Sequence, residues 1–537
     1  MTHIKTVCAV VSSLLFVWLV LALGEPIFLR FEIPLWQVGL ASALTLLSLV
    51  YLRTLPWSLL AWLALSFGSI AWSLSPAASL RASMWHAVYV AVFLTGMAFP
   101  RYVLAGLVVS HTLILARGLD LFIVTQRDDF NGVWYQQNVQ GSQLLLIAPL
   151  LVHWTAIPSR WSVYLAIPLG FIVFLSGLTF SAASQILLVL GVVVVWIWRW
   201  QALAGKRWEI LFLFIVGMGL AWLVIQPQSA QIFTVNLGKP QVGTRVSDPV
   251  NTLLARVHLI EDISRRALEA LPLGTGIGSL QDIYSHLQRH EIESVDAHNY
   301  YLQTFLTLGI FGILLLLTFF WNSLRAAFLV SEIGISIALG LFMGYLAFDI
   351  MAYIPGIMVL FFALMGVARG LLQYQRPSSV SSSATKHTVK RSLKVGFAVC
   401  FMALPIFWWW WSQPCDDITC FAGRKLADPL VMRVNEPRLS PEQTLRWAAI
   451  GKTRYPETLA YAINYADAVD ALALTANERT RALALYRDIA RRFPRADLGV
   501  YRDWRDAAIR AGDVAEAQQA IRDSYRYYGG TLLLTGF

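Results

Sequence analysis

The sequence predicts an all-α protein: a polytopic membrane bundle of about 13 helices, with a small helical domain at its C-terminal end. Three observations lead to this prediction. Of the 537 residues, 57% are hydrophobic and only 14% are charged, whereas soluble domains carry roughly 25% charged residues. The mean hydropathy is +0.59. Apolar runs of about 20 residues, the length that crosses a bilayer, recur along the chain and stop near residue 412.

Each expected span is an apolar run bounded by polar or basic residues. The first run lacks a clear small-x-small cleavage site after it, so we interpret it as a transmembrane helix and not as a signal peptide. In the fifth run, Arg117 and Asp120 are costly in lipid, and we expect them to face the bundle interior, where they could pair. The predicted spans are residues 5–24, 35–52, 55–74, 84–99, 102–124, 141–157, 161–179, 184–199, 208–226, 301–321, 332–350, 354–371 and 395–412.

Basic residues predict the orientation of these spans. If the N-terminus is cytoplasmic, almost every short inside loop carries Lys or Arg, as the positive-inside rule requires. This rule also explains the net charge of +10 without a nucleic-acid partner. The Ser-rich segment 374–394 is then a flexible cytoplasmic linker. Three segments are then on the outer side of the membrane: 125–141, 227–300 and everything after residue 412.

The chain therefore divides into four parts. Residues 1–226 and 301–412 form the two halves of the bundle, 227–300 form a large outer loop, and 413–537 form an outer helical domain. In this last domain, Ser440-Pro441-Glu442-Gln443 and Thr475-Ala-Asn-Glu478 fit capping boxes, and Asp513 is a good N-cap. Its amphipathic helices loosely fit stacked hairpins of the tetratricopeptide type. We expect this domain to bind a partner and not to carry chemistry.

The four cysteines fall into two pairs. Cys8 and Cys400 lie in apolar runs and are expected to be buried, inert thiols. Cys415 and Cys420 lie close together just outside the last span, in the oxidising compartment, where they can form a small disulfide loop. No second pair completes a four-ligand zinc site, and no metal is predicted.

The outer loop 227–300 is the richest in polar groups. A helix over about 249–271 carries Arg256, Arg265 and Arg266, and Arg81 and Arg127 reach the same side of the membrane. Arginine binds phosphate groups bidentately, so such a cluster favours an anionic ligand. The following run, Gly274-Thr-Gly276-Ile-Gly278, is either a tight turn between helices or a backbone turn packed close to a ligand. Both interpretations stay open.

His298 stands directly before the tenth span, in the stretch "SVDAHNYYLQ". A histidine at a helix start is often a capping residue, but a neutral imidazole there can also accept a proton from a hydroxyl near neutral pH. Asp296 could orient the imidazole or cap the helix, and capping is favoured. Asn299 and Tyr300 could hold the site by hydrogen bonds.

These residues resemble a known family. The stretch "DAHNYYLQTFLTLGIFG" is similar to the H-N-x-x-L-Q…G-x-x-G signature of the O-antigen ligase (Wzy_C) superfamily. The stretch "ARVHLIEDISRRALEALPLGTGIGSLQ" resembles its R-x-x-x-W…P-L-G-x-G-x-G block, with Ile260 at the Trp position. "VWYQQNVQGSQLL" resembles the Q-P-N segment of bacterial O-oligosaccharyltransferases of the PglL type, with Gln137 at the Pro position. The resemblance covers residues 130–315.

The resemblance implies a multi-pass enzyme of the bacterial inner membrane with its C-terminal domain in the periplasm. Such enzymes transfer a glycan from a polyprenyl-pyrophosphate carrier to a periplasmic acceptor, without metal, cofactor or nucleotide. The long periplasmic tail is similar to the protein-glycosylating branch, which implies transfer to Ser or Thr hydroxyls of a pilin-like protein. The implied roles are His298 as general base, Arg256, Arg265 and Arg266 as pyrophosphate ligands, and Gln137, Asn138, Asn299 and Tyr300 as further substrate-binding residues.

One position departs from the family. Where the family often has Ser-Arg at the outer surface, this chain has Ser181-Ala182, and Arg81 or Arg127 could replace the missing cation. Two alternatives stay open: a lipopolysaccharide O-antigen ligase or polymerase, and a transporter for the lipid-linked glycan. The C-terminal domain disfavours the first. The absence of an internal sequence repeat and the gathering of polar residues in one loop disfavour the second.

Overall fold

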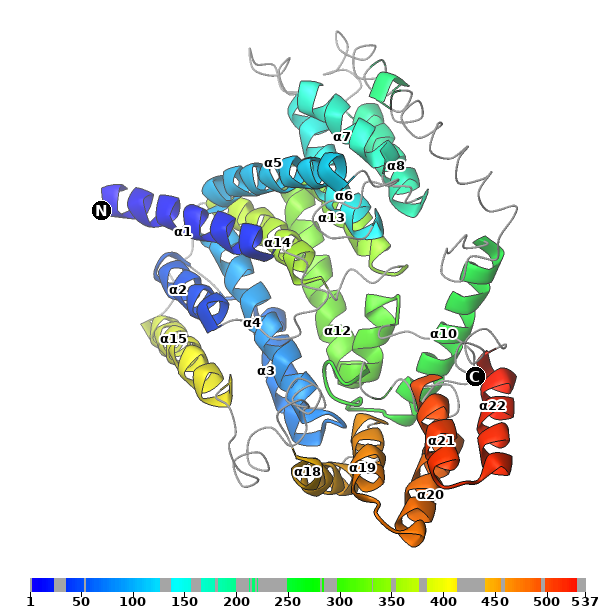
Figure 1. Cartoon of the computed structure of the whole chain (residues 1–537). Helices are drawn as coiled ribbons and strands as arrows, with labels where there is room; N and C mark the ends of the chain where they lie inside the picture. The colour runs from blue at the N-terminus through cyan, green and yellow to red at the C-terminus, as the bar shows by residue number, and fades with distance from the viewer. Residues whose placement is uncertain are drawn as a thin grey trace.

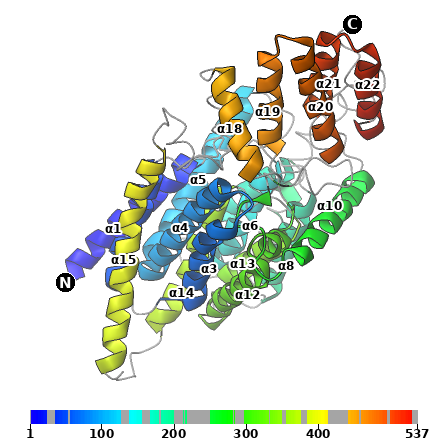
Figure 2. The same cartoon turned by 90° about the horizontal axis from the view of Figure 1, so that it is seen from below.

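The computed structural model is an assembly of α-helices (Figures 1 and 2). No strand occurs among the residues that it describes, which confirms the predicted all-helical class. The described residues are 2–23, 35–52, 55–125, 137–155, 166–178, 182–198, 212, 215–217, 220, 249–280, 283, 297–330, 332–348, 354–375, 384–412, 440–454, 459–493 and 498–528.

The helices follow one another in three groups. The first group is α1 (Thr2–Leu23), α2 (Leu35–Tyr51), α3 (Trp57–Gly68), the 3-10 helix η2 (Ser69–Trp72), α4 (Pro76–Ala98), α5 (Pro100–Thr125), α6 (Gln137–Thr155), α7 (Ala166–Leu178) and α8 (Ala182–Trp198). The second is α10 (Pro249–Glu269), α12 (Tyr300–Leu329), α13 (Ile333–Tyr345), α14 (Pro355–Gln375) and α15 (Ala384–Ser412). The third is α18 (Pro441–Arg454), α19 (Leu459–Leu472), α20 (Ala476–Arg492), α21 (Leu498–Arg510) and α22 (Val514–Tyr528).

The first two groups contain helices suited to a membrane. Every predicted span except 208–226 overlaps a helix, and most of 208–226 lies outside the described residues. Shorter apolar helices accompany the long ones, so the number of spans stays a prediction. The segments that are long and apolar enough to cross a bilayer are Ile4–Leu21, Pro76–Ala98, Pro100–Asp120, Tyr300–Leu329 and Pro355–Gln375.

Helix α4 forms the centre of the bundle, with α2, α3 and α14 packed around it (Figure 1). Almost all of its side chains are buried. Small residues let α4 and α14 approach closely: a Cβ on Gly96 would stand 2.6 Å from the carbonyl oxygen of Ala363, and one on Gly370 would stand 2.5 Å from that of Met97. Glycine at such crossings is typical of membrane helices, whose association depends on close backbone packing.

One end of the bundle gathers residues from loops that are predicted to share a side of the membrane. Lys5 Nζ donates to the Tyr374 hydroxyl at 2.9 Å, and this hydroxyl donates to the carbonyl of Ala98 at 3.2 Å. Lys394 Nζ donates to the carbonyl of Leu52. These contacts agree with the predicted alternation of the loops. Which end faces the cytoplasm stays a prediction.

The linker predicted over 374–394 is wrong in its second half. Helix α15 begins at Ala384, so residues 384–394 are helical. The stretch "ATKHTVKRSLK" contains no Gly or Pro and several good helix formers, and the helix of the following apolar span therefore extends back through it. Residues 376–383 lie outside the described part.

Two further expectations within the spans are wrong. Arg117 and Asp120 do not face the bundle interior: both are exposed and they form no ion pair with each other. Helix α5 has 26 residues and is about 39 Å long, so its last turns can extend past a hydrocarbon core of about 30 Å. Cys400 is exposed and Cys8 is half-buried, both as free thiols. Cys415 and Cys420 lie outside the described residues.

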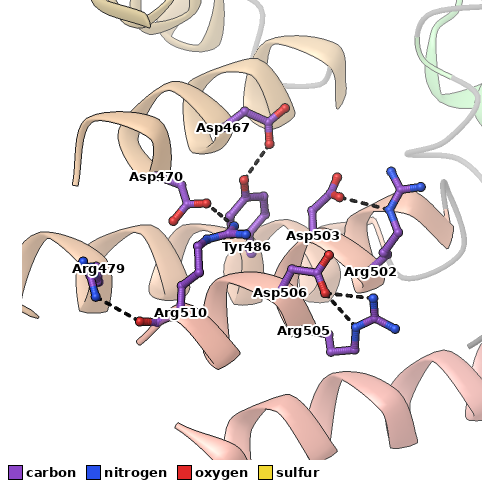
Figure 3. Close-up of polar contacts among 9 residues, drawn as sticks. All are labelled: Asp467, Asp470, Arg479, Tyr486, Arg502, Asp503, Arg505, Asp506 and Arg510. Atoms are coloured by element: carbon purple, nitrogen blue, oxygen red, sulfur yellow. Dashed lines mark hydrogen bonds and ion pairs between the residues drawn. The ribbon is translucent and has the colours of Figure 1, made fainter. Parts of the chain in front are cut away.

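Helices α18–α22 form a separate array in which each helix packs against the next (Figures 1 and 2). The predicted capping box is confirmed: the hydroxyl of Thr475 accepts from the N–H of Glu478, whose carboxylate accepts from the N–H of Thr475. Asp513 caps α22 by accepting from the N–H of Glu516 at 2.9 Å. Side-chain contacts between the helices hold the array together (Figure 3). Its likeness to tetratricopeptide repeats stays a prediction.

Candidate functional site

The site centres on a break in helix α12. At Gly309 the backbone angles, φ 64° and ψ −160°, are not helical. The break removes the helical donors of the two carbonyl groups at 306 and 307, and the turn that follows α10 supplies replacements. The three hydrogen bonds across the break are Thr275 N to Leu306 O at 2.9 Å, Gly276 N to Thr307 O at 2.9 Å, and Ile310 N to Pro272 O at 3.2 Å.

The glycine run forms the turn that makes these bonds. Gly274, Gly276 and Gly278 have φ angles of 78°, 95° and 72°, which L-residues with a Cβ rarely adopt. A Cβ on Gly276 would also stand 2.7 Å from the Cα of Ser73. The glycines therefore serve close packing of the turn against the protein's own backbone, which decides between the two interpretations of this run. We call residues 274–278 the glycine turn.

Hydrogen bonds fasten the glycine turn to η2 and to the short segment between η2 and α4. The N–H of Ile277 donates to Ser69 Oγ at 3.1 Å, and the N–H of Leu74 donates to the carbonyl of Thr275 at 3.0 Å. The hydroxyls of Thr275 and Ser279 lie 2.8 Å apart. These bonds join α10, α12 and η2 into one unit at this end of the bundle.

Helix α10 packs on the first half of α12 through one stripe of residues. Leu259, Ile263 and Ala267 on α10 share an apolar cluster with Ala297 and Leu306. Since α10 leads into the glycine turn, its C-terminal end lies at the break in α12 and its earlier residues lie toward the start of α12.

Arg256 lies one turn before Leu259 on this stripe and is half-buried. Leu259 belongs to the same apolar cluster as Ala297, the residue before His298. That Arg256 and His298 act at one site stays a prediction.

Arg265 and Arg266 occupy a different place. They lie nine and ten residues after Arg256, which is about 14–15 Å along the helix axis. Both contact Glu269: Arg265 Nη1 is 3.0 Å from Oε1, and Arg266 Nη1 is 3.3 Å from Oε2. The pKa of the Glu269 carboxyl lies below its ordinary value, chiefly because Arg266 donates a hydrogen bond to it and both arginines attract its charge. The three arginines of α10 therefore form two groups.

His298 sits in an unusual backbone conformation. Its φ angle is 45°, a left-handed value that histidine tolerates better than most L-residues. Asn299 is the N-cap of α12, and its Oδ1 accepts from the N–H of Leu302 at 3.0 Å. The predicted preference for Asp296 as the cap is therefore wrong, and Asp296 itself lies outside the described residues.

Tyr300 anchors the start of α12 through its backbone. Its N–H donates to the carbonyl of Leu346 at 2.8 Å, and the hydroxyl of Tyr301 donates to the carbonyl of Met343 at 2.7 Å. The Tyr300 side chain is buried in the bundle. Its predicted role as a substrate contact stays a prediction.

The remaining predicted residues are only partly placed. Arg81 lies in the second turn of α4, is 6% exposed, and is next to Ala82, which lies under Gly278. Gln137 and Asn138 begin α6, but their side chains lie outside the described part of the chain. Arg127 and Ser181 also lie outside it. The residue next to Arg81 thus contacts the glycine turn, and the role of Arg81 as the substitute cation stays a prediction.

Two polar residues of α10 were not predicted. Glu269 follows Arg265 and Arg266 at spacings of four and three. This spacing is typical of ion pairs within a helix, so the sequence could have predicted the contact. Asp262 is 1% exposed, and only the positions of Leu259 and Ile263 on the same stripe could have indicated its burial. Among the described residues, no group of three or more His, Cys, Asp or Glu could hold a metal.

Residues 165–317 match a protein-family model. The family is Wzy_C, described as O-Antigen ligase. The Wzy_C segment includes α7, α8, α10, the glycine turn, His298 and the break in α12. No curated protein matches the chain. The Wzy_C segment and the apolar helices together indicate an integral membrane enzyme of the glycosyltransferase-like ligase type.

Proposed function

We propose that the protein is a metal-independent oligosaccharyltransferase of the bacterial inner membrane. It transfers a glycan from a polyprenyl-pyrophosphate carrier to Ser or Thr hydroxyls of a periplasmic, pilin-like protein. The observation that carries the proposal is the packing of α10, which carries Arg256, against α12, which begins just after His298, within the Wzy_C segment.

The proposed chemistry needs a base and a cationic site. The acceptor oxygen forms a bond to the anomeric carbon of the sugar, the bond from this carbon to the phosphate oxygen breaks, and the polyprenyl diphosphate leaves. His298 accepts the hydroxyl proton as the oxygen attacks. Negative charge grows on the departing diphosphate, and an arginine placed in advance stabilises this charge.

Arg256 is the first choice for this arginine because it lies one turn before Leu259, which shares an apolar cluster with Ala297, the residue before His298. Arg81 is the second choice, since it is almost fully buried beside the glycine turn. Arg265 and Arg266 are paired with Glu269, and we assign them to a later part of the carrier or glycan. Arg127, Gln137, Asn138 and Asn299 stay candidate substrate contacts.

The acceptor distinguishes this proposal from its closest competitor. The family match favours an O-antigen ligase, whose acceptor is a glycolipid. The array α18–α22 favours a protein acceptor, because it is an additional folded unit with no helix suited to span a membrane among its described residues. The break in α12 would also suit a transporter, but its polar groups are bonded within the protein.

The first experiment replaces His298 in the purified protein reconstituted in lipid with a polyprenyl-pyrophosphate glycan donor and a pilin-like acceptor. His298→Ala should abolish transfer while donor binding persists, because the base is lost and the arginines remain. Arg256→Ala should weaken donor binding and transfer together. Wild-type transfer by His298→Ala would refute the catalytic assignment.

A second experiment identifies the acceptor class. Periplasmic proteins and lipopolysaccharide are compared by mass spectrometry with and without the gene. Loss of a glycan from a periplasmic protein is the expected result. Loss confined to lipopolysaccharide would establish the ligase and contradict the protein acceptor.

A further inference from the structure

A basic and aromatic patch lies where α18, α19 and α20 meet. Lys452 Nζ stands over the ring of Tyr465, 4.9 Å from its centroid. Arg481 Nη2 donates a hydrogen bond of 3.4 Å to the hydroxyl of the same tyrosine. We call these three residues the Tyr465 patch. Each comes from a different helix, so the patch exists only in the folded array.

Backbone packing creates the patch. A Cβ on Gly451 would stand 2.6 Å from the Tyr461 ring carbon Cγ, so glycine lets α18 approach α19 closely. Tyr461 and Tyr465 are four residues apart and lie on one face of α19. The close approach at Gly451 therefore carries Lys452, the next residue, to Tyr465.

The carboxylates near the patch form contacts elsewhere, whereas its two cations form no ion pair with a described residue. The two described carboxylates of α19 face other contacts: Asp467 accepts a hydrogen bond of 2.6 Å from the Tyr486 hydroxyl, and Asp470 pairs with Arg510 (Figure 3). Neither Lys452 nor Arg481 has a carboxylate within ion-pair distance among the described residues. Within the described part of the array, two cations thus share one aromatic ring without a paired carboxylate.

We propose that the Tyr465 patch binds a carboxylate of an acidic peptide segment in the acceptor protein. The inference rests on the proposed transfer to a protein. Two cationic donors suit a carboxylate, and the tyrosine ring offers an apolar surface to the methylene groups of an Asp or Glu side chain. The array lies beside α10 in both views (Figures 1 and 2). A peptide held there is presented to the side of the bundle that carries the proposed site.

The test measures peptide binding by the full chain in lipid nanodiscs, without any glycan donor. A fluorescein-labelled hexaglutamate peptide is titrated and its anisotropy recorded. We expect saturable binding that weakens as salt rises. The double substitution Lys452→Ala with Arg481→Ala should weaken it about tenfold, the product of two exposed ion pairs. Lys452→Arg with Arg481→Lys keeps both charges and should retain binding.

The control is Arg491→Ala, which removes one positive charge ten residues further along α20 and is matched to the single variant Arg481→Ala. It should bind the peptide like the wild type. No binding by the wild type, or an equal loss in Arg491→Ala, would overturn the proposal. Stronger binding of a glucuronate disaccharide or of inorganic polyphosphate than of the peptide would overturn it too, because the patch would then serve the glycan or a phosphate.

His298→Ala separates this inference from the proposed function. That variant should bind the peptide with wild-type affinity although it transfers no glycan. If transfer fails in every assay but the peptide still binds at the Tyr465 patch, the docking inference stands and the transfer proposal falls. Circular dichroism of each variant confirms that the array remains folded.

Discussion

The glycine turn should tolerate no side chain at Gly276. The φ angle there is 95°, and a left-handed conformation costs an L-residue about 1–2 kcal/mol. An added Cβ would stand 2.7 Å from the Cα of Ser73, and such overpacking costs roughly 1–3 kcal/mol. Together, Gly276→Ala should destabilise the folded protein by about 2–5 kcal/mol, a large share of the stability of an ordinary domain.

The assay compares the free energy of unfolding in lipid, by steric trapping, with glycan transfer at a temperature where the variant remains folded. The control is Gly344→Ala in α13, where a Cβ meets nothing within 4 Å. That change should be neutral or stabilise by about 0.5–1 kcal/mol, because glycine is unfavourable inside a helix. The Gly276→Ala variant should lose transfer as well, since the turn holds α10 against α12.

A double-mutant cycle isolates the contact. Ser73→Gly removes the nearest side chain and should recover part of the loss in Gly276→Ala, while the backbone strain and the Ser73 Cα remain. The expected coupling is about 1–2 kcal/mol. If Gly276→Ala matched Gly344→Ala in both stability and transfer, the proposed role of the turn would be wrong.

Three further outcomes follow from single contacts. Glu269→Gln should lower the KM for the donor several-fold, because it removes the carboxylate that pairs with Arg265; an unchanged or higher KM contradicts this. Thr475→Ala should cost about 1 kcal/mol of stability in the C-terminal array, as read by thermal unfolding. The pKa of the Glu478 carboxyl lies below its ordinary value because the backbone and hydroxyl of Thr475 donate to it. The stability from this cap is therefore full above the ordinary value of 4.5 and is lost as pH falls through the lower folded value. Thr475→Ala should flatten that acid dependence.

The helices of the bundle were predictable because apolar length alone identifies them. The caps of the C-terminal array were predictable for a similar reason: Thr475 and Glu478 bond within one turn, and their spacing is visible in the sequence. The prediction of a flexible linker failed over residues 384–394, because the Ser-rich composition was given more weight than the helix propensity of these residues. The prediction that Arg117 and Asp120 face the bundle interior failed as well. It used the rule that charged residues in a span avoid lipid, and this rule applies only within the hydrocarbon core.

The members of the candidate site stay predictions, but the structure changes their grouping. The sequence names Arg256, Arg265 and Arg266 together. Helix geometry separates them, and Arg265 and Arg266 pair with Glu269. The left-handed conformation of His298 has no sequence signal.

The break in α12 explains why two glycine-containing motifs occur together in this chain. An apolar helix interrupted at Gly309 leaves carbonyl groups without donors, which is costly in lipid. The glycine turn supplies those donors only because its backbone can approach α12 without side chains: a Cβ on Gly274 would stand 2.6 Å from the backbone nitrogen of Gly309, and one on Gly309 would stand 2.8 Å from the carbonyl carbon of Leu273. Each motif therefore requires the other. Helix α10, which carries the three arginines, is thereby held against α12, whose first residue follows His298 and Asn299.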